Sequence, residues 1–271
     1  MTAIVSDQYN CIIGSRWDGT ALPDDEKIFI SISVVDDNTS TTPVLVINVD
    51  APYYNDPAPR YDPEATNATS VPSLNFDGLW NYEVVEIFIK GKLDKYIEIE
   101  MGPHGHYLIL ALDGYRHCFK RGIEPLSYEA KIEEKRWSGK LIAPIDILPP
   151  STGIPEAMFS YNAYGIHEGR PSPLSSCVES QNCDTRVYCC AYPPGKAEGE
   201  YLVPDFHKLQ LFQHLKHPLL VTANKSLASS LWSGRQGLCM DFAASPRFTA
   251  SVPKEDAAIQ DDGSASPTLR E

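Results

Sequence analysis

Four glutamates are the residues best suited to chemistry, because they recur at close spacing on two successive strand-forming runs. They are Glu83, Glu86, Glu98 and Glu100. Paired carboxylates can divide acid and base roles when their environments separate the two pKa values, and they can also hold a hard cation. For Glu98 and Glu100 we favour a solvated strand face with Lys90 or Lys92 across the ladder, since cross-strand charge pairs are common.

Glu86 differs from the other three because it shares a strand face with Val84 and Phe88, and both faces of that strand are apolar. A carboxylate there is either buried and paired or directed into a site. Removing the partner of a buried charge costs roughly 3–5 kcal/mol, so a basic residue must meet Glu86. We expect that residue to be Arg116 or His167.

Three histidines could join Glu86 in a metal-dependent active site: His104, His167 and His207. A catalytic metal centre needs three protein ligands and an open position, but here only the fold can bring the ligands together. Alternatively, His104 shapes its Gly-Pro-His-Gly turn and His207 helps to cap its own helix. We expect at most two of the three histidines to approach each other, and the sequence identifies no cofactor.

Aromatic residues form a second set of candidates, because sugars stack on exposed aromatic planes while acids and amides bind their hydroxyl groups. The loop over residues 51–73 is rich in Pro, Asp and Asn and supplies several of them, and long ordered loops are often functional. We expect at least one tryptophan of the set to belong to the core, since Trp is heavily buried on average. This ligand-binding set comprises Trp17, Tyr53, Tyr54, Asp56, Trp80, Tyr82 and Trp137.

Three runs of β-branched and aromatic residues must position these side chains: 79–89, 96–101 and 107–112. In the middle run Ile97 and Ile99 fall on one face and glutamates on the other, a period of two that is typical of a half-buried antiparallel strand. Short runs of this kind recur along the chain with few helices and no Gly-rich phosphate loop. The pattern predicts an all-β fold, an antiparallel β-sandwich of jelly-roll type with few short helices.

One β-sandwich domain is expected over residues 11–216, with an inserted Ser/Pro-rich loop at 169–185. Residues 1–10 should form a flexible N-terminus, and 217–244 an extension of uncertain structure. Residues 245–271 have too little apolar area to offset the entropy of ordering, which predicts a disordered tail.

The formal net charge of -13 over 271 residues argues against nucleic acid and anionic membranes as partners, because both attract clustered Lys and Arg. No apolar run approaches the ~20 residues that span a bilayer, and residues 1–10 do not resemble a signal peptide. Seven cysteines without an export signal predict reduced thiols and a cytoplasmic location. Those between 177 and 190 lack the two-residue gap of zinc ribbons, so we expect no zinc site there.

Several short motifs follow one another in order through most of residues 17–212. They are Trp17-Asp18-Gly19, Ala51-Pro52 with Asp56-Pro57, Leu79 to Glu86, Pro103-His104-Gly105, Trp137 to Lys140, Ile166-His167 and Pro204 to His207. In this order they resemble the UPF0462 family of chromosome-4-open-reading-frame-33-like proteins. The function of that family is not established, so the resemblance implies a family without an activity.

A looser resemblance links residues 80–89, 96–100 and 137–148 to family-9-type carbohydrate-binding and DOMON-like sandwiches. Those modules show an acidic strand, an alternating strand and a Trp-containing strand in this order. The resemblance implies a jelly-roll-like sandwich that binds sugars, or haem in some relatives. Tyr82-Glu83 stands where such modules carry paired Asp, so no calcium site is carried over.

The leading hypothesis is a non-catalytic binding module for a small-molecule or glycan ligand, either a carbohydrate or a polyol. The aromatic set, Glu83, Glu86 and the three histidines are its candidate ligand-binding residues. No Ser, Cys or Thr lies in a nucleophile motif such as Gly-x-Ser-x-Gly, so covalent catalysis is not expected. Two alternatives stay open, namely a metal-assisted enzyme that uses a Glu/His cluster and a protein-interaction scaffold without a small ligand.

Overall fold

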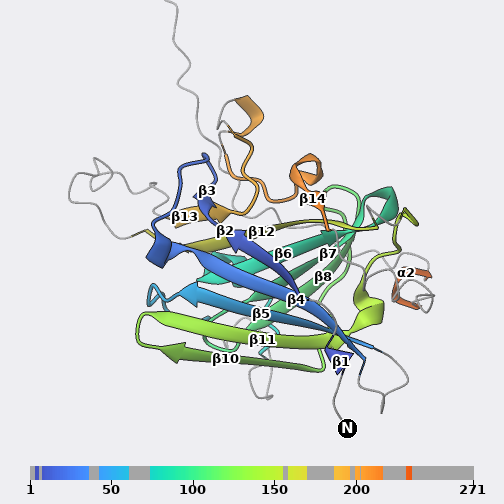
Figure 1. The fold of residues 1–271 in the computed structure, drawn as a ribbon, viewed down its shortest axis with the longest axis horizontal. Coiled ribbons are helices and arrows are strands. Elements are labelled where there is room, and N and C mark those ends of the chain that lie inside the picture. The colour runs from blue at the N-terminus through green and yellow to red at the C-terminus, as the bar shows by residue number, and fades with distance from the viewer. Residues whose placement is uncertain are drawn as a thin grey trace, which may run out of the picture.

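Strand-forming runs assemble into two antiparallel sheets that pack face to face as a β-sandwich (Figure 1), which confirms the predicted fold class. The structure is a computed structural model and describes residues 4–5, 8–36, 43–60, 74–154, 158–169, 186–195, 199–201, 203–215 and 230–233. The predicted inserted loop beyond residue 169, the tail at 245–271, most of the extension at 217–244 and part of the N-terminus at 1–10 lie outside these residues. The predicted domain boundaries therefore stay predictions.

The first sheet has six strands, and each pairs antiparallel with its neighbours. Isoleucine and valine alternate with polar residues along these strands, as expected where only one face covers a core. In spatial order the strands are β1 (Ile4–Val5), β4 (Ile28–Asp36), β5 (Val44–Pro52), β11 (Arg136–Pro144) and β10 (Ser127–Glu133), and β2 (Tyr9–Ile13) also pairs with β4.

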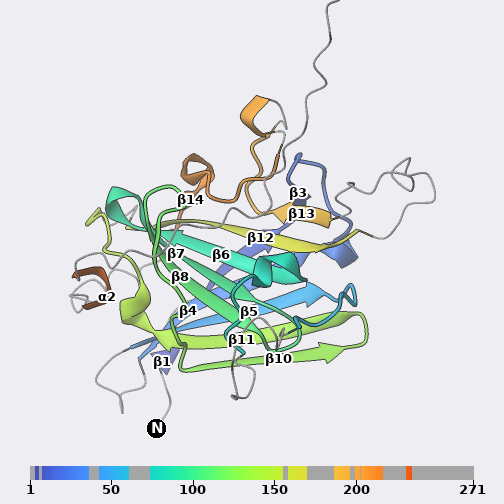
Figure 2. The same ribbon diagram turned by 180° about the vertical axis from the view of Figure 1, so that it is seen from behind.

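The second sheet has eight strands, and the predicted central runs form its middle as two successive hairpins. Viewed from behind, these central strands lie in front of the first sheet (Figure 2). In spatial order the strands are β3 (Ser15–Arg16), β13 (Arg186–Cys190), β12 (Ser160–Glu168), β6 (Val84–Lys90), β7 (Lys95–Met101), β8 (Tyr107–Asp113) and β9 (Cys118–Lys120), and β14 (Gln213–His214) also pairs with β12.

Helical segments in the described part of the chain are single turns, and none of them is both long and apolar enough to cross a membrane. They are η1 (Asp24–Glu26), η2 (Leu79–Asn81), η3 (Lys92–Asp94), η4 (Ile145–Ile147), η7 (Gly199–Tyr201), η8 (Leu209–Leu211) and α2 (Ser230–Ser233).

The space between the sheets is filled by aliphatic side chains from both, a cluster that we call the inner core. Ile87, Ile97, Ile99 and Met101 of the second sheet and Leu141 of the first are at most 1% exposed. Burying a side chain of this size contributes about 1.5–3 kcal/mol. The alternation of the middle run therefore predicted the inward face of β7 correctly.

The opposite face of the second sheet is buried as well, under an apolar cluster that we call the outer core. Phe88, Tyr96 and Leu110 enter it from strands, and Phe206 and Phe212 cover them from the segment that follows η7. The second sheet is therefore a central layer with an apolar cluster on each side.

The outer core overturns the solvated face expected for Glu98 and Glu100, whose residues are 4% and 0% exposed. Lys90 does not pair with them and instead forms an ion pair with Asp94. The alternation of β7 distinguishes two chemically different faces, but it does not show whether another segment of the chain covers the polar one.

Four cysteines in the described residues are buried and form no disulfide bond: Cys11, Cys118, Cys189 and Cys190. Cys189 lies in the inner core and Cys190 in the outer core, because adjacent strand residues point to opposite faces. Burial raises the pKa of both of these thiols to about 12.

Candidate functional site

The candidate residues separate into two groups. One group lies in the loops at the end of the sandwich where β5 and β12 finish, and the other lies on β6 and β7 beneath the outer core. We call the first group the loop-end cluster; it comprises Tyr53, Tyr54, Asp56, Glu83, His104 and His167.

Glu83 organises the loop-end cluster by accepting backbone hydrogen bonds from the loop that follows β5. The N–H of Tyr54 lies 3.2 Å from both carboxylate oxygens, and the N–H of Asp56 lies 3.4 Å from Oε2. The Trp137 side chain also donates to this carboxylate. Burial raises the pKa of Glu83 to about 7. The hydrogen-bond donors oppose this rise, whereas the nearby charge of Asp56 adds to it.

Asp56 connects the same loop to two neighbouring segments. Its Oδ2 accepts the backbone N–H of Glu168 at 2.7 Å, and its carbonyl oxygen accepts a hydrogen bond from Nε2 of His104 at 3.1 Å. Burial raises the pKa of the Asp56 carboxyl. The loop is thereby held to the end of β12 and to the turn between β7 and β8.

Two ring pairs complete the loop-end cluster. The rings of Tyr54 and His167 are stacked, with centroids 3.4 Å apart and planes at 3°. Tyr53 and His104 meet edge to face at 6.0 Å. Tyr53 and His104 are only half buried, so part of this aromatic surface is accessible to solvent.

The tryptophans divide as expected, with at least one in the core. Trp17 and Trp137 are 4% and 1% exposed, and the indole N–H of Trp17 donates to the carbonyl oxygen of Tyr201 at 2.7 Å. Trp80 and Tyr82 are half buried and pack against the outer core, so they are not members of the loop-end cluster.

The second group is a cluster of three buried glutamates, Glu86, Glu98 and Glu100. In the β6–β7 pairing Glu86 lies opposite Glu100, and Glu98 lies opposite Phe88. One carboxylate oxygen from each glutamate lies within 4.8 Å of the others. Three carboxyl groups thus share a small space that the outer core closes.

Burial sets the ionisation of this buried glutamate cluster. Burial, and then the charge of Glu98, raises the pKa of Glu86 well above its usual range. Burial, and then the charges of Glu86 and Glu98, does the same for Glu100. Burial also raises the pKa of Glu98, to about 7, although the charge of Arg116 opposes the rise.

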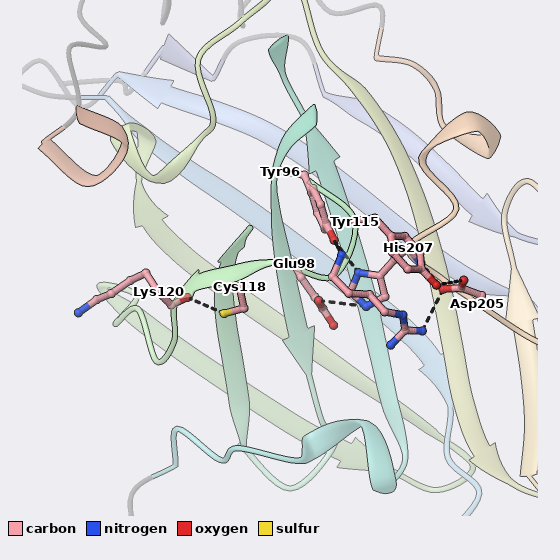
Figure 3. A network of polar contacts seen from close by, with 8 residues as sticks. Tyr96, Glu98, Tyr115, Cys118, Lys120, Asp205 and His207 are labelled. Carbon is pink, nitrogen blue, oxygen red and sulfur yellow. Dashed lines mark hydrogen bonds and ion pairs between the residues drawn. The ribbon is translucent and has the colours of Figure 1, made fainter. Parts of the chain in front are cut away.

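His207 approaches Glu98 of the glutamate cluster from the covering segment (Figure 3). Its Nε2 lies 3.9 Å from Oε2 of Glu98, and its Nδ1 lies 2.7 Å from the hydroxyl of Tyr96. The Tyr96 oxygen also accepts the backbone N–H of Arg116 at 3.1 Å, so the hydroxyl joins His207 to the segment that contains Arg116. Burial, and then the charge of Arg116, lowers the pKa of His207 to about 3.

Asp205 anchors the covering segment beside His207. It accepts hydrogen bonds from the Tyr115 hydroxyl at 2.7 Å, from Nη2 of Arg116 at 2.9 Å and from the backbone N–H of His207 at 3.1 Å (Figure 3). Burial raises the pKa of Asp205, but the Tyr115 hydroxyl and Arg116 outweigh this and hold it below its usual range.

The predicted partner of Glu86 is half right. Arg116 is one of two cations whose charge lowers the pKa of Glu86, and Arg186 is the other. His167 was the wrong choice, because its ring stacks on Tyr54 in the loop-end cluster.

The predicted metal centre of Glu86 with three histidines is not assembled. Among the described residues, the group of potential ligands within mutual reach of one ion consists of glutamates alone. His104 and His167 belong to the loop-end cluster, whereas His207 lies in contact with the outer core. This agrees with the expectation that at most two of the histidines approach each other.

Glu98 and Glu100 are the site residues that the sequence placed wrongly, although a signal for their burial exists. Their cross-strand partners on β8 are Leu110 and Leu108, and Leu112 continues the same face. A leucine at every second position beside the glutamates indicates an apolar environment on that face.

The raised pKa of Glu83 predicts a specific pH dependence of stability. A carboxyl group that binds its proton more tightly in the folded protein stabilises it most below the ordinary pKa near 4.5, and this stabilisation is lost as the pH rises through 7. Relative to Glu83→Gln, the wild-type protein is expected to lose on the order of 2–3 kcal/mol between pH 5 and pH 8. Urea unfolding of both proteins at the two pH values measures this difference, and a constant difference contradicts the raised pKa.

Fold and site together define an antiparallel β-sandwich protein with a polar, aromatic loop end and a buried acidic cluster. No family model matches the chain. The UPF0462 protein C4orf33 homolog of Danio rerio is 33% identical over 204 residues, which are 74% of this chain and 85% of that relative. The UPF0462 protein C4orf33 of Homo sapiens is 30% identical over 224 residues, 81% of this chain and 94% of the human protein. The chain therefore belongs to the UPF0462 family.

One solved structure resembles the chain at 14% sequence identity and a TM-score of 0.43. It is described as "a putative carbohydrate-binding protein" from Bacteroides uniformis, and the likeness covers 76% of this chain and 84% of that protein. A likeness at this level carries no functional information.

Proposed function

We propose that this protein is a non-catalytic binding module and that its ligand is a carbohydrate or polyol held by the loop-end cluster. The observation that supports the proposal is the anchored loop. Glu83 accepts the N–H groups of Tyr54 and Asp56, while the rings of Tyr53 and His104 beside them stay half exposed.

An anchored loop favours binding because it is ordered before the ligand arrives. Each side chain that is immobilised on binding costs about 0.5–1.5 kcal/mol. Here the carboxylates of Glu83 and Asp56 already fix the backbone, and the stacking of Tyr54 on His167 fixes one ring. The half-exposed rings then offer apolar faces beside polar groups, as binding of a polyhydroxylated ligand requires.

The buried tryptophans play no part in this proposal. Trp17 lies in the outer core and Trp137 in the inner core, and neither presents a ring face to a ligand. Trp137 contributes only indirectly, through its hydrogen bond to Glu83. Tyr53 is therefore the aromatic ring that we assign to ligand stacking.

The proposal predicts that Tyr53→Ala abolishes or strongly weakens glycan binding. A nucleic-acid base stacked on an aromatic side chain contributes about 1–3 kcal/mol to binding. We expect a stacked sugar ring to contribute on the same scale, so the affinity should fall tenfold or more. A glycan array identifies the tightest ligand of the wild-type protein, and calorimetry then measures its affinity for the variant.

Phe29→Ala is the matched control, because Phe29 is an exposed aromatic residue on β4 and does not belong to the loop-end cluster. Its affinity for the same glycan should equal that of the wild type. Failure of every glycan and polyol on the array, or equal affinity of the Tyr53→Ala protein, contradicts the proposal.

A further inference from the structure

The buried glutamate cluster of Glu86, Glu98 and Glu100 lies apart from the loop-end cluster and takes no part in the proposed function. These residues are 2%, 4% and 0% exposed. One oxygen from each lies within 4.8 Å of the others. Like charges at such distances in a region of low dielectric repel strongly, so something positive must lie between them when they ionise.

A second observation is independent of this proximity. Glu98 and Glu100 interact with each other, but both oxygens of Glu100 and Oε2 of Glu98 are buried without a hydrogen-bond donor from any other described residue. A buried polar group left unsatisfied costs about 1–3 kcal/mol, and more if it is charged. The hydroxyl of Tyr164, whose residue lies opposite Glu86 on β12, is also buried without a partner. Several oxygens on one patch of the sheet thus lack the donors that buried oxygens normally have.

The neighbouring arginines, Arg116 and Arg186, are engaged by other groups. Arg116 is engaged by Asp205 in an ion pair at 2.9 Å, and Arg186 donates to the carbonyl oxygen of Trp80 at 2.8 Å. Their charges act on Glu86 only as Coulomb interactions.

We propose that Glu86, Glu98 and Glu100 bind a divalent cation that prefers oxygen ligands, with Ca²⁺ the best match. Three carboxylates offer up to six oxygens, the lower limit of the six to eight that Ca²⁺ takes at 2.3–2.6 Å. Oxygens that share such an ion lie at most about 4.6–5.2 Å apart, and one oxygen from each of the three glutamates lies within 4.8 Å of the others. Mg²⁺ fits less well, because it keeps several waters and the outer core leaves the cluster enclosed.

His207 supports this site as a neighbour rather than as a ligand. Its Nε2 lies 3.9 Å from Oε2 of Glu98, and carboxylate ligands in metal sites are commonly supported by neighbouring polar groups. Carboxylate ligands without a nitrogen or sulfur favour Ca²⁺ and Mn²⁺ over Zn²⁺.

The experiment uses the full chain, stripped with EDTA and dialysed into metal-free buffer. Calorimetry with CaCl₂, and with MnCl₂ as a second probe, should give one ion per chain. Because an ion that binds only the folded state stabilises it, the melting temperature should rise by several degrees at saturating Ca²⁺. Glu98→Gln and Glu100→Gln should each weaken binding tenfold or more and reduce the thermal shift accordingly.

Glutamine keeps the shape of a protonated carboxyl group, so these variants should fold even if the wild-type cluster is protonated. Glu129→Gln, at an exposed position on β10, is the control and should bind like the wild type. Equal binding by Glu100→Gln places the ion elsewhere and overturns the proposal. Absence of binding by the wild-type protein also overturns it and leaves shared protons as the means of charge compensation. Neither outcome affects glycan binding at the loop-end cluster, which the array measures separately.

Discussion

Replacing Phe88 by alanine is expected to lower the free energy of unfolding by about 3–5 kcal/mol. Phe88 is fully buried on a central strand, and its ring meets those of Tyr164 and His207 edge to face at 5.3 Å. The rings of Tyr96 and Phe212 lie at 6.2 and 6.1 Å. The substitution therefore removes the centre of the outer core, and urea unfolding measures the loss.

Phe29→Ala makes the same chemical change on the other sheet, where the side chain is 42% exposed. Its expected cost is below about 1 kcal/mol, as for most surface substitutions. Because both variants replace phenylalanine by alanine, any difference between their free energies of unfolding comes from the burial of the side chain. If the two variants unfold at the same urea concentration, the second face of β6 is not packed as the structure has it.

A smaller change, Gly91→Ala, is expected to cost about 3–4 kcal/mol. A Cβ atom at this position lies 2.1 Å from the carbonyl oxygen of Pro150, which is backbone and cannot rotate away. The same carbonyl accepts the N–H of Lys92 at 2.8 Å, so moving it breaks a hydrogen bond as well. The hairpin between β6 and β7 must then separate from the Pro149-Pro150 segment.

Gly14→Ala provides the comparison for this prediction. An added Cβ there meets only a side-chain carbon of Ile12 at 3.9 Å, which is ordinary van der Waals contact. Thermal unfolding of both variants should show a large decrease in melting temperature for the Gly91 variant and little change for the other. Similar melting temperatures contradict the close approach at Gly91.

The β-sandwich could be predicted from the sequence because its determinants are local. The alternation of Ile97 and Ile99 identifies the inward face of β7 without reference to any other part of the chain. The apolar faces on both sides of β6 likewise marked Glu86 as buried, and it is. Each of these inferences needs only the period of two along a strand.

The composition of the site could not be predicted in the same way, because its contacts join distant segments. The hydroxyl of Tyr96 bonds to His207 across 111 residues, and no local pattern relates the two positions. The segment that contains Phe206 decides whether Glu98 meets water or an apolar cover. The polar residues of a strand face can be recognised from the sequence of that strand. Whether this face is exposed to water or buried depends on a segment elsewhere in the chain.

The adjacent cysteines of β13 give each side of the second sheet its own chemical reporter. A thiol reacts as the thiolate, and burial raises the pKa of both Cys189 and Cys190 to about 12, so modification requires that the surrounding layer first opens. Cys189 is released only when the two sheets separate, and Cys190 only when the covering segment lifts from the outer core. The two events have separate free energies of local opening. The alkylation rate of Cys189 therefore measures how often the inner core opens, and the rate of Cys190 measures how often the outer core opens.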